Sequence, residues 1–130
     1  MILGIGIDIL ETARMSKWQQ DQGFLKRFMH PRELEDALGS KEDSAMLFAS
    51  RFSVKEAFGK ALGTGLRGLQ LKDIALDHDS VGRPVLALTG TALAAFRRIG
   101  GVATHVSLSH QDSMVAAVVI IEGAAAGNDQ

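Results

Sequence analysis

The sequence predicts one α+β domain, in which a small antiparallel sheet packs on one long helix and several short ones. Apolar strand-like segments lie at both ends of the chain, a long helical segment lies between them, and no linker or internal repeat interrupts the chain. With 130 residues, 46% of them hydrophobic, the chain has the size and apolar content of a single domain with a core. We expect the domain to span residues 1–122. The tail, residues 123–130, should be disordered because its small and polar residues have nothing to bury.

The first elements are a strand and a series of short helices. β-branched and small residues alternate over residues 2–9, as in a buried strand. Residues 11–28 carry large apolar residues at roughly helical intervals, and we expect Gly23 to divide this stretch. Pro31 suits the first turn of a short helix, and Gly39 is placed to end it.

The longest predicted element is a helix over residues 43–62. Residues 40–43 resemble a capping box with Asp in place of the usual Glu, and the Gly63-Thr64-Gly65 turn closes the helix. Beyond it, turn and strand signals alternate. They predict, in order, a strand at 71–77, a turn at 79–82, a strand at 84–88, a helix at 91–99, and strands at 102–109 and 114–122.

Composition excludes several classes of function. The formal net charge of −1 gives no overall bias toward nucleic acid or membranes. There is no cysteine, which excludes disulfides, thiolate metal sites and cysteine nucleophiles and suits a reducing compartment. The apolar start is interrupted by Asp8 and lacks the flanking features of a signal peptide, and no segment approaches the roughly 20 apolar residues that span a bilayer. We expect a soluble, cytoplasmic protein.

Charged residues in apolar surroundings are the first candidates for a site. Asp8 lies within the first predicted strand, where a buried carboxylate needs a partner; alternatively, it ends the strand and accepts hydrogen bonds from a turn. Glu56 and Lys60 are four residues apart and share a helix face. An isolated pair of this kind is usually an exposed ion pair worth about 0.2–0.5 kcal/mol. The apolar, small-residue helix around the pair favours a face turned toward a cleft.

A second candidate is the strand from His105 to His110. Alternation places His105, Ser107 and Ser109 on one face of it, where imidazole and hydroxyl groups could bind phosphate oxygens or could simply face solvent. His105 and His110 point to opposite faces, which argues against a shared zinc ion.

Four segments form a larger pattern, namely GIGIDI at residues 4–9, RFSVKEAFGKALGTG at 51–65, GRP at 82–84 and HVSLSH at 105–110. Together, and in this order, they resemble the short form of the 4′-phosphopantetheinyl transferase superfamily. The resemblance runs from residue 1 to about residue 122. The Phe-x-x-Lys-Glu-Ala-x-x-Lys helix combined with the N-terminal Gly-x-Asp is highly specific to this superfamily.

The resemblance implies an enzyme that moves the phosphopantetheine arm of coenzyme A onto a serine hydroxyl of an apo acyl carrier protein, for fatty acid biosynthesis. Adenosine 3′,5′-bisphosphate would be the leaving group. Asp8 and Glu56 would bind one Mg²⁺, which prefers oxygen ligands and keeps waters and substrate phosphates. Longer relatives have another acidic ligand where this chain has Leu10, so we expect water there. Lys60 would stabilise phosphoryl charge. The general base stays open between Glu56 and a metal-bound hydroxide.

The resemblance also implies a coenzyme A pocket and a homotrimer with sites between subunits, because the short form lacks half of the two-lobed body of longer relatives. Arg51 would contact a coenzyme phosphate or support the subunit contact. The residues implied at the coenzyme are Arg51, Lys60, Gly63, Thr64, Gly65, Gly82, Arg83, Pro84, His105, Ser107 and Ser109.

A local excess of positive charge suggests where an acidic carrier protein docks. Residues 14–32 contain Arg14, Lys17, Lys26, Arg27 and Arg32 against only Asp21. The resemblance gives Arg14 a contact with an acidic carrier residue, and we also assign Phe24 and Arg27 to the partner surface. The alternative is a solvated helix whose aromatic residues belong to the core, and the role of Trp18 stays open.

Two rival functions share part of this pattern. A Mg²⁺-dependent phosphohydrolase would use the same two carboxylates with water as the nucleophile, but it would not need the basic segment. A binding module that has lost turnover would keep Asp8, Glu56 and Lys60 together only by chance, which argues against it.

Overall fold

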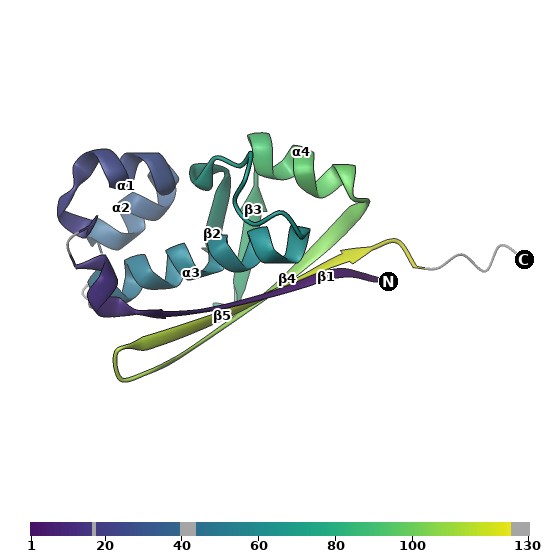
Figure 1. Cartoon of the computed structure of the whole chain (residues 1–130). Helices are drawn as coiled ribbons and strands as arrows, with labels where there is room; N and C mark the ends of the chain where they lie inside the picture. Colours follow the sequence, from purple (N-terminus) through teal and green to yellow (C-terminus); the bar gives the residue numbers. More distant parts are fainter. Residues whose placement is uncertain (17, 40–43, 126–130) are drawn as a thin grey trace, which may run out of the picture.

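The computed structural model describes residues 1–16, 18–39 and 44–125 (Figure 1). With η marking a 3-10 helix, its elements are β1 (Ile2–Glu11), η1 (Thr12–Met15), η2 (Trp18–Gln20), α1 (Gln22–Phe28), α2 (Pro31–Gly39), α3 (Ser44–Leu62), η3 (Leu71–Asp73), β2 (Ile74–His78), β3 (Pro84–Leu88), α4 (Gly90–Arg98), β4 (Gly101–Gln111) and β5 (Met114–Gly123). The expected α+β class is confirmed. Antiparallel strands form one sheet in the order β1-β5-β4, and β2 pairs with β3 in a second. No described helix is long and apolar enough to cross a membrane.

Helix α3 lies along one face of the β1-β5-β4 sheet, and two glycines of β1 allow the close approach (Figure 1). A Cβ atom on Gly6 would lie 1.8 Å from the carbonyl oxygen of Ala57, and one on Gly4 would lie 1.8 Å from that of Ala61. Any larger residue would therefore push the strand away from the helix. Because side chains alternate along β1, Asp8 points to the same face as these glycines.

The opposite face of this sheet carries an apolar row. Ile5, Ile7 and Ile9 are 60%, 65% and 66% exposed, although they are large hydrophobic residues in the middle of β1. Contiguous apolar surface of this kind usually marks an interaction site.

A second core lies between α1, α2 and the first half of α3, and it is rich in aromatic side chains. The ring centroids of Trp18 and Phe24 lie 4.9 Å apart, and those of Phe24 and Phe28 lie 4.7 Å apart. Phe52 of α3 packs against both Trp18 and Phe28. Aromatic packing thus fixes the α1 region on the start of α3.

A buried ion pair joins α2 to α3. The Nζ atom of Lys55 lies 2.7 Å from Oε1 of Glu33, and the two side chains are 0% and 1% exposed. Burial lowers the pKa of Lys55, and the Glu33 carboxylate opposes this shift. The remaining bonds go to the backbone: Lys55 donates to the carbonyls of Leu71 and Ile74, and Glu33 accepts from the amides of His30 and Leu76.

The structure confirms most of the expected elements and corrects two details. Gly23 does not divide the 11–28 segment; it lies inside α1, because the Asp21 carboxylate accepts from the amide of Phe24 at 3.1 Å and caps the helix. The strand expected from residue 71 begins at Ile74, after the 3-10 helix η3. The predicted capping box at 40–43 and the tail from residue 126 lie outside the described residues.

Candidate active site

Asp8, Glu56 and Lys60 come together where β1 lies along α3. Asp8 lies in the middle of β1, paired with Ala117 of β5, so it does not end the strand. Its side chain is 15% exposed and faces α3. Glu56 and Lys60 lie one turn apart on α3, with Glu56 half-buried and Lys60 exposed. The face of α3 that carries Glu56 and Lys60, which we expected to turn toward a cleft, therefore faces the Asp8 carboxylate of β1.

Two side chains of α3 hold the Asp8 carboxylate. The Lys60 ammonium lies 3.3 Å from Oδ1 and also donates to the carbonyl of Ile7 at 2.9 Å. The Ser53 hydroxyl donates to Oδ2 at 2.9 Å, from a side chain that is fully buried. Sequence reasoning did not select Ser53, because a helical serine carries no signal by itself.

The electrostatics of the pair suit a divalent cation. Burial raises the pKa of Glu56, the nearby Asp8 carboxylate raises it further, and Lys60 partly opposes both effects. Two carboxylates that are close enough to repel each other are stabilised by a cation between them. Among the described residues, no group of three or more His, Cys, Asp and Glu side chains gathers at one point. Zinc and calcium sites use larger sets, whereas Mg²⁺ is commonly held by one or two carboxylates with water and phosphate.

The turn after α3 folds back onto the helix beside Lys60. Gly63 and Gly65 adopt φ angles of 86° and 65°, which favour glycine. The amide of Gly65 donates to the carbonyl of Gly59 at 2.9 Å, and a Cβ atom on Gly59 would lie 2.6 Å from the Gly65 backbone. This turn therefore brings the Gly65 backbone close to the Lys60 end of α3.

Arg51 lines a hollow of about 430 Å³ between α3, β2 and β4. It is 6% exposed, and its Nε atom has no hydrogen-bond partner among the described residues. His110 of β4 and His78 of β2 line the same hollow. Sequence reasoning missed His110, since only the structure shows which inner-face residues of β4 meet Arg51.

The turn containing Gly82, Arg83 and Pro84 joins β2 to β3, next to His78, which lines this hollow. Pro84 is paired directly with His78 across the two strands. Gly82 has a φ angle of 85°, and the Asp79 carboxylate accepts from the amide of Arg83 at 2.9 Å. The guanidinium of Arg83 also pairs with Asp79, at 3.3 Å, and its side chain is 73% exposed.

His105, Ser107 and Ser109 do not join Asp8 within a single chain. All three are exposed, and they pair across β4 and β5 with Ile120, Val118 and Ala116, on the sheet face opposite α3. His105 contacts Glu122 at 2.8 Å on that face. One site containing both this row and Asp8 therefore requires a second copy of the chain.

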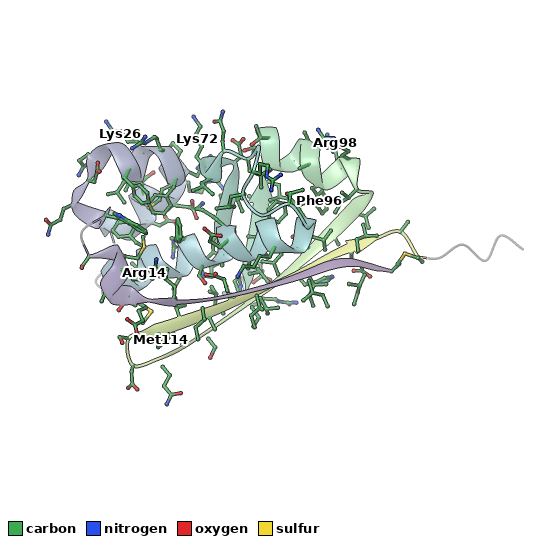
Figure 2. The ribbon with its side chains drawn as sticks, viewed as in Figure 1. Arg14, Lys26, Lys72, Phe96, Arg98 and Met114 are labelled. Atoms are coloured by element: carbon green, nitrogen blue, oxygen red, sulfur yellow. The ribbon has the colours of Figure 1, made fainter. Side chains whose placement is uncertain are left out.

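The basic segment separates into two surfaces. Arg14 borders a hollow of about 380 Å³ with Trp18, whereas Arg27 lines a groove of about 410 Å³ with Lys26 and Lys72. Figure 2 shows Lys26 and Lys72 on neighbouring elements, apart from Arg14. Phe24 stacks within the aromatic core and is half-buried, so it supports α1 and keeps only part of its surface for a partner.

Comparison with known proteins identifies the family. The family model of the 4′-phosphopantetheinyl transferase superfamily matches residues 4–119. The chain is 54% identical to a holo-[acyl-carrier-protein] synthase of Treponema denticola, over 95% of this chain and 100% of the relative.

Solved structures of holo-[acyl-carrier-protein] synthases have the same fold as this chain. The holo-[acyl-carrier-protein] synthase of Neisseria meningitidis superposes with a TM-score of 0.85 at 34% identity, covering 94% of this chain and 99% of that one. The enzyme from Bacillus anthracis, in complex with CoA (3′,5′-ADP), has a TM-score of 0.79 at 32% identity, covering 95% and 99%. The chain therefore belongs to the 4′-phosphopantetheinyl transferase superfamily, among its holo-[acyl-carrier-protein] synthases.

Proposed function

We propose that this chain transfers the 4′-phosphopantetheine group of coenzyme A to a serine hydroxyl of an apo acyl carrier protein, in the cytoplasm and for fatty acid biosynthesis. The observation that carries the proposal is the meeting of Asp8, Glu56 and Lys60 where β1 lies along α3. Two carboxylates and one ammonium at an accessible surface are what phosphoryl transfer from a pyrophosphate requires. We assign the activity to residues 1–122.

The reaction forms one bond and breaks one. The serine oxygen of the carrier attacks the phosphorus next to pantetheine, and the bond from that phosphorus to the bridging oxygen breaks, releasing adenosine 3′,5′-bisphosphate. Lys60 is placed to stabilise charge on the phosphate oxygens. Glu56 is one candidate for the group that accepts the serine proton, since its raised pKa brings it toward the range of a useful base.

Asp8 and Glu56 are the proposed ligands of one Mg²⁺. The arrangement supports this assignment. The two carboxylates come from neighbouring elements, β1 and α3, and Asp8 is close enough to Glu56 to raise its pKa. When bound, the ion would polarise coenzyme phosphate oxygens and neutralise charge that develops there. Water would complete its shell on the side of Leu10, as expected for an ion that keeps several waters.

We further propose that coenzyme A extends from this carboxylate pair over the Gly63-Thr64-Gly65 turn. Arg51 is the proposed phosphate contact, because its Nε atom has no hydrogen-bond partner in the described part of the chain. His110 lies in the same hollow. The Gly82-Arg83-Pro84 turn would form the wall beside His78.

A homotrimer would complete the pocket. The exposed row of Ile5, Ile7 and Ile9 gives each chain an apolar face suited to contact with another copy. That face is the one that carries His105, Ser107 and Ser109, so association would bring this row toward a neighbouring copy's site. The same contact would cover large apolar residues that are otherwise exposed.

An acidic carrier protein is the proposed partner, docked on the surfaces of Arg14 and Arg27. Arg14 is exposed beside an open hollow, and Arg27 is exposed in a groove with two lysines. These positive surfaces complement an acidic helix and would steer its approach. The half-buried Phe24 would add an apolar contact.

The deciding experiment is the intact mass of an apo acyl carrier protein after incubation with this chain, coenzyme A and Mg²⁺. The proposal predicts the gain of one phosphopantetheine, which disappears with a chelator and with a carrier whose acceptor serine is alanine. Asp8→Ala and Glu56→Ala should each abolish the gain while leaving the fold intact. Consumption of coenzyme A with unchanged carrier mass would instead favour the phosphohydrolase, and binding without any consumption would favour a binding module.

A further inference from the structure

Ser53 is a buried polar residue to which the proposed mechanism assigns no role. Its hydroxyl is fully buried in α3 and donates to Oδ2 of Asp8 at 2.9 Å, with a longer contact of 3.4 Å to the Asp8 carbonyl oxygen. Residues 8 and 53 are 45 positions apart in the chain, so this bond is a tertiary link between β1 and α3.

The other group that holds Asp8 is not fixed in the same way. The side chain of Lys60 is 51% exposed, and its ammonium lies 3.3 Å from Oδ1. In the proposed reaction Lys60 serves the coenzyme phosphate, and an exposed lysine has many accessible rotamers. Ser53 is therefore the one described side chain that would keep hold of Asp8 when Lys60 turns to the substrate.

Ser53 also links the two proposed metal ligands. Ser53 and Glu56 are three residues apart on α3, so their side chains lie on the same face of one rigid element. A hydroxyl that fixes Asp8 to this helix fixes it relative to Glu56 as well.

We infer that Ser53 is a positioning residue that sets the spacing and orientation of the Asp8 and Glu56 carboxylates for cation binding. This inference rests on the proposed function of the same site. It goes further by naming a residue outside the carboxylate pair on which the affinity for the cation depends. Groups that orient metal ligands by hydrogen bonding commonly change metal affinity or activity by about 10–100-fold when removed.

The test compares Ser53→Ala with Ser53→Cys, which keeps the shape of the side chain with a somewhat larger atom but supplies only a weak donor. Ser50→Ala is a matched control, because Ser50 lies on the same helix and its hydroxyl donates to the Met46 carbonyl at 2.8 Å instead of to Asp8. Binding of Mn²⁺ alone is measured from the electron paramagnetic resonance signal of the free ion, and thermal unfolding monitors the fold. The transfer assay at varied Mg²⁺ gives a second readout.

We expect Mn²⁺ affinity to fall at least about tenfold in Ser53→Ala, less in Ser53→Cys, and not in Ser50→Ala. In the transfer assay, the Mg²⁺ concentration for half-maximal rate should rise by a similar factor, while saturating Mg²⁺ restores most of the rate. Folded Ser53 variants with unchanged Mn²⁺ affinity would overturn the inference, even if their unfolding temperatures fell. A wild-type chain that binds Mn²⁺ but transfers nothing would refute the proposed function instead, and one that transfers phosphopantetheine but binds no Mn²⁺ would refute the inference alone.

Discussion

The buried network around Lys55 predicts an unusual response to removal of an ion pair. Lys55→Met leaves the Glu33 carboxylate 1% exposed with no cation beside it. Loss of one partner of a buried pair usually costs about 3–5 kcal/mol of unfolding free energy. We expect a loss of this size, because the Glu33 side chain is almost fully buried.

The double variant Lys55→Met/Glu33→Leu distinguishes a simple ion pair from a backbone clamp. Replacing both partners of a simple buried pair by apolar residues is often neutral or stabilising by about 1–4 kcal/mol. Here, Glu33 also accepts from the amides of His30 and Leu76, at 3.1 and 2.9 Å. Each amide left without an acceptor costs about 1–3 kcal/mol. If exchange of the two charges is itself neutral, the double variant should therefore stay about 2–6 kcal/mol less stable than the wild type.

Urea unfolding followed by tryptophan fluorescence measures these differences, since Trp18 is the only tryptophan and lies in the aromatic core. All proteins are compared at one concentration. Arg32→Met is the control: it breaks the Arg32–Asp77 pair of 3.0 Å, whose side chains are 64% and 36% exposed, and should cost at most about 1 kcal/mol. A double variant as stable as the wild type would refute the clamp.

Four further outcomes are expected. In the presence of a chelator at neutral pH, Glu56→Gln should unfold at a higher temperature than the wild type. The pKa of Glu56 is raised in the folded state, so ionisation of Glu56 lowers the stability of the wild type as pH rises from 4.5 through the folded pKa. The difference in unfolding temperature should therefore vanish at about pH 4. Gly6→Ala should destabilise the fold by at least about 1–3 kcal/mol, as its Cβ would meet backbone at 1.8 Å, whereas Gly23→Ala on exposed helix surface should stabilise it slightly in thermal melts. Ile7→Asp should shift the particle mass in light scattering toward the monomer, and an unchanged mass would remove this face from the interface. Arg14→Glu should weaken binding of an acyl carrier protein in calorimetric titrations but leave coenzyme A affinity intact; equal loss of both would contradict the assignment of Arg14 to docking.

The elements of the fold could be predicted largely from local pattern. Alternation in residues 2–9 and the helical stretch before Gly63 correspond to β1 and α3. The boundary at the start of α1 depends on capping by a side chain: the Asp21 carboxylate caps the helix, and Gly23 is accommodated inside it. Local pattern cannot distinguish a glycine that breaks a helix from one that lies near its start.

The site could be predicted only in part, because residue types identify ligands more readily than the groups that hold them. Asp8 and Glu56 stood out as carboxylates in apolar segments. Ser53 did not, since its role depends on how β1 lies against α3. For His105, alternation correctly grouped the strand face, but a sequence cannot say that this face lies on the far side of the sheet from Asp8.

The glycine contacts of β1 determine which kinds of redesign this enzyme could tolerate. At Gly4 and Gly6 the strand meets the carbonyl groups of α3 directly, so the distance between the two elements is fixed by main-chain atoms and not by the size of packed side chains. Core libraries that vary Val54, Phe58 or Val119 would alter stability while leaving this separation unchanged. The proposed site should therefore tolerate changes in the core, whereas a single added methyl group at either glycine should displace β1 and its carboxylate from α3.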